Sequence, residues 1–132
     1  TAKGGGKGGA PPRLFSAALA AETGRSLPLD WLSTQCVGRH RGLLKASYFP
    51  PCKAAPNQKR LAAHADLSHF TILFAESEGL EVIQDGQWRR VPVFQDRFIV
   101  NVGNQLERLS NGRFKSGIHR VNFEDGGANG RI

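Results

Sequence analysis

From Gly42 onward the sequence consists of short apolar stretches separated by turn residues, and this pattern restricts the possible folds more than any other feature. Asp85-Gly86 lies between two such stretches, and this pair favours a tight hairpin because the turn needs positive φ. Strands are predicted at 43–49, 61–65, 70–75, 80–84, 87–91, 97–102 and 117–123. Many short strands at regular spacing predict a mainly β domain, a sandwich or barrel of antiparallel strands.

The N-terminal third has a different composition. Residues 1–12 are rich in Gly, Lys and Pro, which predicts a flexible tail. An Ala- and Leu-rich stretch predicts a helix at 14–23, and a second short helix is predicted at 28–35, with a proline near its first turn. We therefore expect a tail at 1–12, a helical lead-in at 13–41 and a β core at 42–132, with one helical turn at 105–109.

Length and charge restrict the class of protein. The chain has 132 residues, enough for one domain with a core of its own. Residues 1–63 hold ten basic and two acidic side chains (+8), whereas residues 64–132 hold eight and nine (−1). Because no basic groove with interleaved aromatic residues is visible, we expect no nucleic-acid partner.

Cysteine content and hydropathy exclude further classes. Cys36 and Cys52 are too few for a disulfide scaffold. No apolar run approaches the roughly 20 residues of a membrane span, and no signal-peptide pattern is visible at the N-terminus. We therefore expect a cytoplasmic protein with no membrane partner. Because the sequence contains no Met, we also expect it to be a piece of a longer protein.

One short motif offers metal ligands. His64 and Asp66 lie at the end of a predicted strand, where residues two apart share a face. This pair alone is also compatible with a surface histidine beside a solvated carboxylate. His119 adds a second imidazole in another predicted strand. Two histidines and one carboxylate form the facial triad of non-haem Fe(II) oxygenases, which leaves positions open for a cosubstrate and O₂. Zinc could bind the same residues, but no general base is evident beside them.

Arg131 follows His119 by 12 residues, after a turn rich in Gly and Asn at 125–130. A guanidinium on a neighbouring strand could bind the distant carboxylate of a dicarboxylate cosubstrate through two hydrogen bonds. A solvated arginine is the alternative interpretation of this residue taken alone.

A series of motifs follows in a fixed order from about residue 43 to the end, some two thirds of the chain. They are Y-F-P-P-C at 48–52, H-A-D at 64–66, T-I-L-F at 71–74, G-L-E-V at 79–82, G-Q-W at 86–88, V-P at 91–92, V-N-V-G-N at 100–104, S-N-G-R-F-K-S at 110–116 and H-R-V at 119–121. In order and spacing they resemble the plant-type 2-oxoglutarate- and Fe(II)-dependent dioxygenases, the isopenicillin N synthase-like family.

The resemblance implies a double-stranded β-helix (jelly-roll) core at 42–132, incomplete at both ends. It implies Fe(II) bound by His64, Asp66 and His119, and 2-oxoglutarate bound by the metal and by Arg131. The iron centre would then be the catalytic group, with no separate acid or base. The implied reaction is hydroxylation or desaturation of a small organic molecule with O₂, releasing succinate and CO₂. The substrate and the oligomeric state are not specified.

The chain departs from the family pattern at three places. Phe49 stands where the family has a second Tyr whose hydroxyl helps to hold 2-oxoglutarate, and losing such a bond costs on the order of 0.5–1.5 kcal/mol. Asn104 replaces an Asp, a change expected to affect local structure more than iron. The family's R-x-S pair is represented by Arg131 alone, since Ile132 is the last residue of the sequence.

Four further residues have predicted roles. His69 follows the metal motif on a loop and is a candidate substrate contact, as is Phe114. Arg120 alternates away from His119 and is expected to be a structural or surface residue. Trp88 is expected to pack in the hairpin.

Three further functions are considered. A related non-haem iron oxidase that does not use 2-oxoglutarate is suggested by Phe49. A non-catalytic fragment or pseudoenzyme acting as a binding module is suggested by the missing strands, because unpaired edges favour pairing with another chain. Nucleic-acid binding through the basic half would require steeply salt-dependent affinity.

Overall fold

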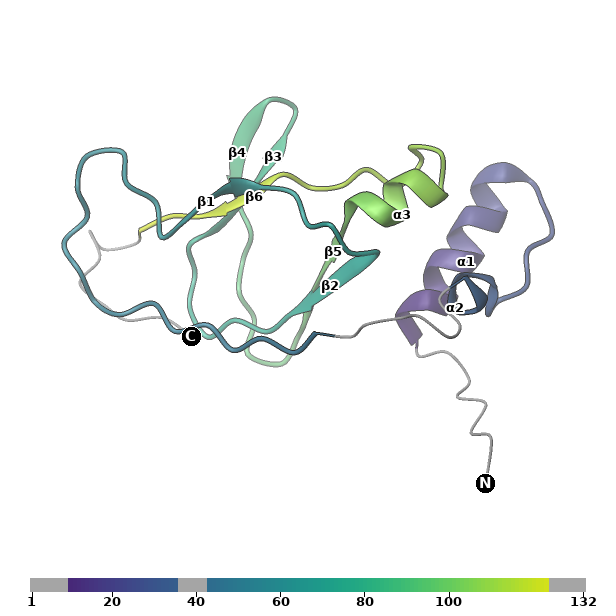
Figure 1. The fold of residues 1–132 in the computed structure, drawn as a ribbon, viewed down its shortest axis with the longest axis horizontal. Coiled ribbons are helices and arrows are strands. Elements are labelled where there is room, and N and C mark those ends of the chain that lie inside the picture. The colour runs from purple at the N-terminus through teal and green to yellow at the C-terminus, as the bar shows by residue number, and fades with distance from the viewer. Residues whose placement is uncertain (1–9, 36–42, 124–132) are drawn as a thin grey trace, which may run out of the picture. The chain divides into compact units, whose positions relative to one another are not determined.

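The computed structural model describes residues 10–35 and 43–123, and the chain divides into two compact units after Leu44 (Figure 1). The helices are Ala10–Thr23 (α1), Trp31–Thr34 (α2) and Asn104–Leu109 (α3). The strands are Leu61–His64 (β1), Phe70–Leu73 (β2), Leu80–Gln84 (β3), Gln87–Arg90 (β4), Ile99–Val102 (β5) and His119–Val121 (β6).

The first unit contains α1 and α2. The helix α1 begins at Ala10, earlier than the predicted start at Leu14, and the prolines at 11 and 12 lie in its first turn, where a helix needs no backbone N–H donor. Ser16 is buried and links the two helices: its hydroxyl donates to the Pro12 carbonyl (2.9 Å) and accepts from the Leu32 N–H (3.1 Å). A satisfied buried hydroxyl therefore holds α2 against α1.

The second unit contains a four-stranded antiparallel sheet in the order β1-β6-β3-β4. The strand β6 lies between β1 and β3, although it comes last in the chain (Figure 1). Leu80 on β3 faces Val121 on β6, and both side chains are buried. The first and last strands of this unit thus pair within its larger sheet.

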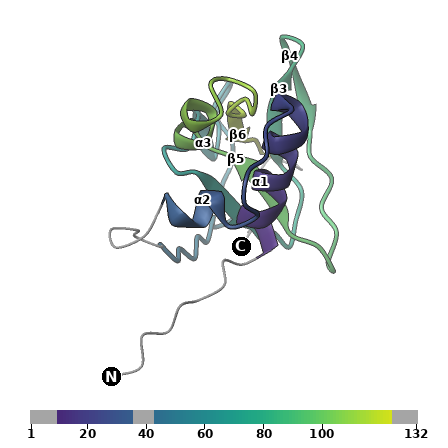
Figure 2. The same ribbon diagram turned by 90° about the vertical axis from the view of Figure 1, so that its right-hand side faces the viewer.

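The predicted hairpin joins β3 to β4. Gln84 pairs with Gln87, so the turn consists of Asp85 (φ 51°) and Gly86 (φ 73°). Positive φ at both positions is the tight primed turn that matches the twist of paired strands. The hairpin projects from the rest of the second unit (Figures 1 and 2).

A two-stranded antiparallel sheet pairs β2 with β5 in an uninterrupted register from Phe70↔Val102 to Leu73↔Ile99. The helix α3 follows β5 directly and buries Leu106, which is 1% exposed. The buried apolar side chains are few among the described residues of this unit: Ala75, Leu80, Leu106 and Val121.

The prediction of a strand at 43–49 is wrong. These residues form no strand, and Phe49 alone makes an isolated bridge. Leu43, Leu44 and Tyr48 are 89%, 99% and 63% exposed, so the β-like pattern of this stretch is not accompanied by burial on one face. Strand formation needs a pairing partner as well as propensity. The other predicted strands correspond to β1 to β6, most of them a few residues shorter than expected.

Candidate metal centre

The two histidines of the site are neighbours across two strands. His64 is the last residue of β1 and His119 the first residue of β6, and the two are register partners with ring centroids 4.3 Å apart. The register shifts between Leu61 and His64, because β1 has one more residue than β6 in this interval. Such a β-bulge re-aims the side chains that follow it. Both imidazoles lie where β1 ends and β6 begins.

Each imidazole is oriented by the backbone carbonyl of the residue two positions before it. The Nδ1 atom of His64 lies 2.9 Å from the Ala62 carbonyl, and the Nδ1 atom of His119 lies 2.9 Å from the Gly117 carbonyl. A carbonyl only accepts hydrogen bonds, so Nδ1 carries the proton in both rings, and the neutral ring has its lone pair on Nε2. This arrangement prepares histidine to bind a metal through Nε2.

Asp66 supplies the third donor. Its Oδ1 atom lies 3.7 Å from Nε2 of His64 and 3.7 Å from Nε2 of His119. Its other oxygen, Oδ2, accepts hydrogen bonds from the Thr71 hydroxyl (2.7 Å) and the Asn101 amide (2.8 Å). One carboxylate oxygen is therefore bonded to the protein, and the other faces the two imidazoles.

The same contacts determine the protonation state of Asp66. Burial alone would raise the pKa of this carboxyl. The hydrogen bonds from Thr71 and Asn101, together with the electrostatic influence of His119 and His64, outweigh burial and lower the pKa of Asp66 below 3.8. The carboxyl is therefore ionised near neutral pH, as a metal ligand must be.

Together these residues form a potential three-ligand metal site. One donor atom from each of His64, Asp66 and His119 lies within 4.8 Å of the other two. The side chains of His119 and Asp66 are 15% and 21% exposed, whereas that of His64 is 38% exposed. Two imidazole nitrogens and one carboxylate suit Fe(II), so the donor set fits the metal that the resemblance implies. No other cluster of three or more His, Cys, Asp or Glu ligands occurs among residues 10–35 and 43–123.

The loop that carries Asp66 is attached to the start of α3. The backbone N–H groups of residues 103, 104 and 105 donate to the carbonyls of His69 (2.9 Å), Asp66 (2.8 Å) and Ser68 (3.2 Å). A Cβ atom at Gly103 would overlap the Ser68 carbonyl oxygen, so only glycine fits there. Asn104, the departure from the family's Asp, thus holds the Asp66 backbone through its own N–H.

The remaining predicted site residues are Arg131, His69 and Phe114, and none of them belongs to the three-ligand cluster. Arg131 and the turn at 125–130 lie outside the described residues. His69 is half-buried, and burial lowers its pKa. Phe114 is also half-buried, and its backbone N–H donates to the Ser110 hydroxyl (3.0 Å). Contact of His69 and Phe114 with a substrate stays a prediction.

Arg120 and Trp88 occupy structural positions, as predicted. Arg120 donates to Glu81 at 2.6 Å, and its guanidinium lies 3.9 Å from the centre of the Trp88 ring. Asn122 also donates to Glu81, and Lys59 donates to Asn122. This network follows the alternation of β6, in which Arg120 points away from the face of His119.

Sequence reasoning did not assign a role to Thr71 or Asn101. Both occur within motifs noted for their resemblance, T-I-L-F and V-N-V-G-N, and each is flanked by apolar residues. A buried polar residue on an otherwise apolar strand needs a hydrogen-bond partner. That need is the sequence feature that could have indicated a supporting role for Thr71 and Asn101.

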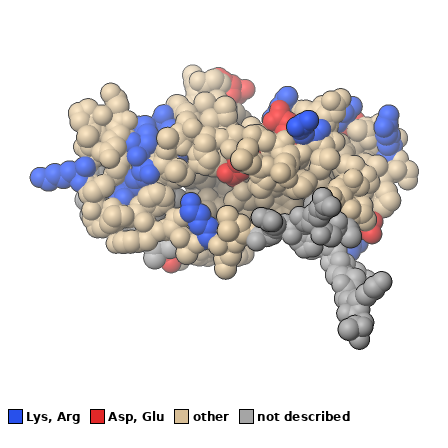
Figure 3. Space-filling view, in the orientation of Figure 1, with Lys and Arg blue, Asp and Glu red and all other residues tan. Residues whose placement is uncertain are grey.

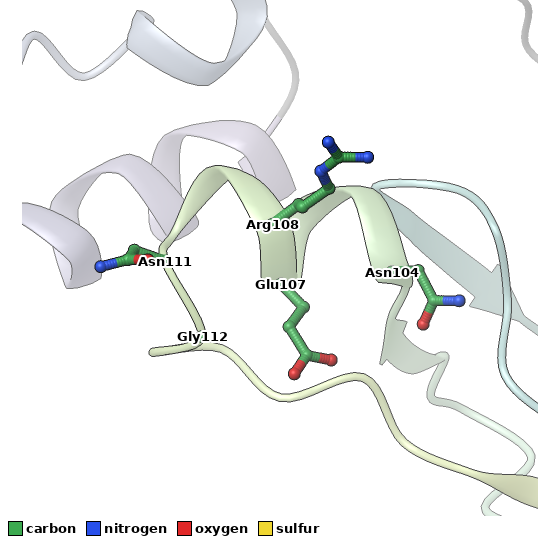
Figure 4. A pocket seen from close by; sticks show the side chains of 5 residues that line it. All are labelled: Asn104, Glu107, Arg108, Asn111 and Gly112. Atoms are coloured by element: carbon green, nitrogen blue, oxygen red, sulfur yellow. The ribbon is translucent and has the colours of Figure 1, made fainter.

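A shallow pocket on α3 is separate from the three ligands. It is lined by Asn104, Glu107, Arg108, Asn111 and Gly112 (Figure 4). In this view Glu107 points toward the segment after Gly112, where its carboxylate accepts from the Ser116 N–H (2.9 Å). The acidic side chain of this pocket is thus already bonded to the protein.

Basic side chains are dispersed over the face of the described residues that Figure 3 shows. On the face in Figure 3, Lys and Arg side chains form separate groups with uncharged residues between them. Among residues 10–35 and 43–123, no helix combines the length and hydropathy that crossing a membrane requires.

An antiparallel β fold that gathers two histidines and one aspartate defines a protein with a potential mononuclear metal site of the facial-triad type. The sequence model of the 2OG-Fe(II) oxygenase superfamily matches residues 40–132. The chain belongs to this superfamily, and the predicted family is confirmed.

Curated relatives agree with this assignment. Flavonol synthase/flavanone 3-hydroxylase of Petunia hybrida is 44% identical over 80 residues, which cover 60% of this chain and 23% of the relative. A 1-aminocyclopropane-1-carboxylate oxidase of Musa acuminata is 42% identical over 79 residues, which cover 58% of this chain and 26% of the relative. The chain therefore spans about a quarter of the length of these relatives.

Solved structures confirm the fold class. JOX2 in complex with 2OG, Fe and JA superposes with a TM-score of 0.73 and 27% identity over 91% of this chain and 34% of that one. A full-length Neurospora crassa protein in complex with alpha-KG gives a TM-score of 0.59 and 30% identity over 64% of this chain and 29% of that one. The predicted fold, mainly β with a double-stranded β-helix core, is confirmed.

Proposed function

We propose that residues 42–132 are part of the catalytic core of an Fe(II)- and 2-oxoglutarate-dependent oxygenase that oxidises a small organic molecule with O₂. The products of the cosubstrate would be succinate and CO₂. The observation that carries the proposal is the convergence of three ligand atoms within 4.8 Å in a chain of this superfamily. The solved relatives described above contain the same cosubstrate, in one case together with iron.

The chain's own residues would perform three tasks at this centre. His64, Asp66 and His119 would hold Fe(II), and their backbone and side-chain hydrogen bonds would fix which atom of each faces the metal. Arg131 would bind the far carboxylate of 2-oxoglutarate. When bound, Fe(II) and 2-oxoglutarate would supply the oxidising chemistry with O₂. The three protein ligands leave the remaining positions for the cosubstrate and O₂.

The test is an anaerobic titration of the chain with Fe(II) and 2-oxoglutarate. The complex of 2-oxoglutarate with the bound Fe(II) should give a weak visible charge-transfer band. His119→Ala should abolish this band, because it removes one of the three protein ligands. His69→Ala is the matched control: it changes a nearby histidine outside the cluster and should leave the band in place. Absence of the band in the unsubstituted chain, or its persistence in His119→Ala, would contradict the proposal.

A related iron oxidase that does not use 2-oxoglutarate is the second candidate. Phe49, which lacks the hydroxyl of the family's Tyr, favours it, and one group of relatives carries the name oxidase. Succinate formation in the presence of O₂ and a substrate distinguishes the two, since only the first candidate releases it.

A further inference from the structure

The carboxylate of Asp66 is held by hydrogen bonds to one of its two oxygens only. Oδ2 accepts from Thr71 at 2.7 Å and from Asn101 at 2.8 Å, whereas Oδ1 lies 3.7 Å from both imidazole Nε2 atoms. We infer that Thr71 and Asn101 are positioning residues that keep Asp66 a ligand through Oδ1 alone. This inference rests on the metal site that the proposed function assigns.

Thr71 and Asn101 act from one place in the fold. They are register partners in the β2–β5 sheet and project from the same face. Their neighbours Ile72 and Val100, also partners, project from the opposite face and are 49% and 46% exposed. The two-stranded sheet thus presents a pair of donors on one side of Asp66.

The donation from Thr71 has a defined direction. A hydroxyl carries a single proton, and the Asp66 carboxylate can only accept, so the Thr71 proton points to Oδ2. The Ser68 hydroxyl, 3.2 Å from the Thr71 oxygen, then donates to it. A chain of hydrogen bonds runs from Ser68 through Thr71 to Asp66, and such chains strengthen their members.

Asn101 also lies close to the segment before His119. A Cβ atom at Gly117 would lie 3.0 Å from the Asn101 Oδ1 atom, so glycine allows the side-chain amide to lie this close to the segment before His119. The Gly117 carbonyl also receives the Nδ1–H of His119. Asn101 therefore lies between the backbone that orients His119 and the carboxylate of Asp66.

Two donors on Oδ2 have a chemical consequence. A carboxylate with one oxygen occupied in this way offers only the other to a cation, and it uses one coordination position instead of two. Without the donors, Asp66 could rotate or bind through both oxygens. Loss of such supporting hydrogen bonds commonly lowers metal affinity about 10–100-fold.

The experiment titrates the full 132-residue chain with Co(II), whose visible absorption reports both affinity and ligand geometry. Thr71→Val and Asn101→Leu preserve volume and remove the donors. Each should weaken Co(II) binding about 10–100-fold and alter the visible spectrum. Thr71→Ser keeps the hydroxyl and should bind as the unsubstituted chain does. Ile72→Val changes the opposite face of the same strand and is the matched control. Circular dichroism of each metal-free variant tests folding.

The outcomes separate this inference from the proposed function. Unsubstituted chain that binds no Co(II) overturns the metal centre and this inference with it. Tight binding by the unsubstituted chain together with equally tight, spectrally identical binding by Thr71→Val and Asn101→Leu overturns this inference alone. Weak binding by Thr71→Ser would also overturn it, because packing of the methyl group would then be responsible. If Thr71→Val or Asn101→Leu does not fold, the Co(II) affinities of the other variant and of Thr71→Ser, compared with that of the unsubstituted chain, test the inference.

Discussion

The two sheets of the second unit contribute to the candidate metal centre in different ways. The four-stranded sheet supplies both imidazoles, as the register pair His64 and His119 at the junction of β1 and β6. The two-stranded sheet supplies no ligand; its register pair Thr71 and Asn101 donates to the carboxylate instead. Asp66, on the loop between β1 and β2, is the residue that side chains of both sheets approach.

The difference between metal ligands and supporting hydrogen-bond donors explains which residues of the site a sequence motif can identify. Ligands must be particular residue types, whereas supporting donors need only a polar hydrogen at the right place. The ligands therefore stand out in the sequence, and their supports are visible only once the strands are paired. The following changes test how far the two sheets depend on each other, from the largest expected effect to the smallest.

Gly103→Ala should have the largest effect, because it disturbs the contact that joins the Asp66 loop to the end of β5. A Cβ atom would overlap the Ser68 carbonyl oxygen, and the backbone has to move. We expect a loss of about 3 kcal/mol in the free energy of unfolding and weaker metal binding. Thermal melting and Co(II) titration measure the two effects. Gly24→Ala, in the first unit, is the control for metal binding: a Cβ atom added there would meet nothing within 4 Å, so Co(II) affinity should not change, although the positive φ of this residue (63°) lowers stability. Equal metal affinity in Gly103→Ala would show that the loop tolerates the shift.

Glu81→Gln should have an intermediate effect confined to the four-stranded sheet. Burial alone would raise the pKa of Glu81, but hydrogen bonds from Arg120 and Asn122 and the charges of Arg120 and Lys59 hold its pKa below 4.5. A carboxyl with a lowered pKa stabilises the fold above its unfolded pKa, and this contribution is lost as pH falls through the folded value.

At pH 7 the substitution should cost about 1.5–3 kcal/mol, since a charged hydrogen-bonded partner is removed from a site that is 12% exposed. Melting curves between pH 7 and pH 3 should show the difference between the two proteins narrowing below about pH 4.5. A difference that stays constant over this range would mean that the charge of Glu81 contributes nothing. Glu78→Gln, at an exposed pair with Arg90, serves as the control.

Asp85→Ala should have the smallest effect, because it lies at the tip of the hairpin, away from both register pairs. Asp85 has φ 51°, and alanine adopts this region less readily than aspartate. We expect a loss of about 1 kcal/mol in stability and unchanged Co(II) affinity. Weaker metal binding in this variant would show that the hairpin is coupled to the site. Asp85→Asn should restore stability, since asparagine tolerates positive φ.

Much of the fold followed from local pattern. The hairpin at Asp85-Gly86 forms as predicted because its turn chemistry is complete within two residues. The stretch at 43–49 has the same apolar character as true strands yet forms none, because a strand depends on a partner that the local sequence does not name. The interval before His64 shows the same limit: the register shift of β1 against β6 could not be read from either strand alone.

The sequence by itself determined the types of the candidate ligands, their order and the family to which the chain belongs, because these depend on residue chemistry and on motif spacing. Only the tertiary structure decided that His64 and His119 are direct cross-strand partners and that Oδ1 rather than Oδ2 of Asp66 faces them. The physical reason is that hydrogen-bond geometry around a carboxylate is set by residues far apart in the chain. Thr71 and Asn101 meet at Asp66 only because β2 and β5 pair.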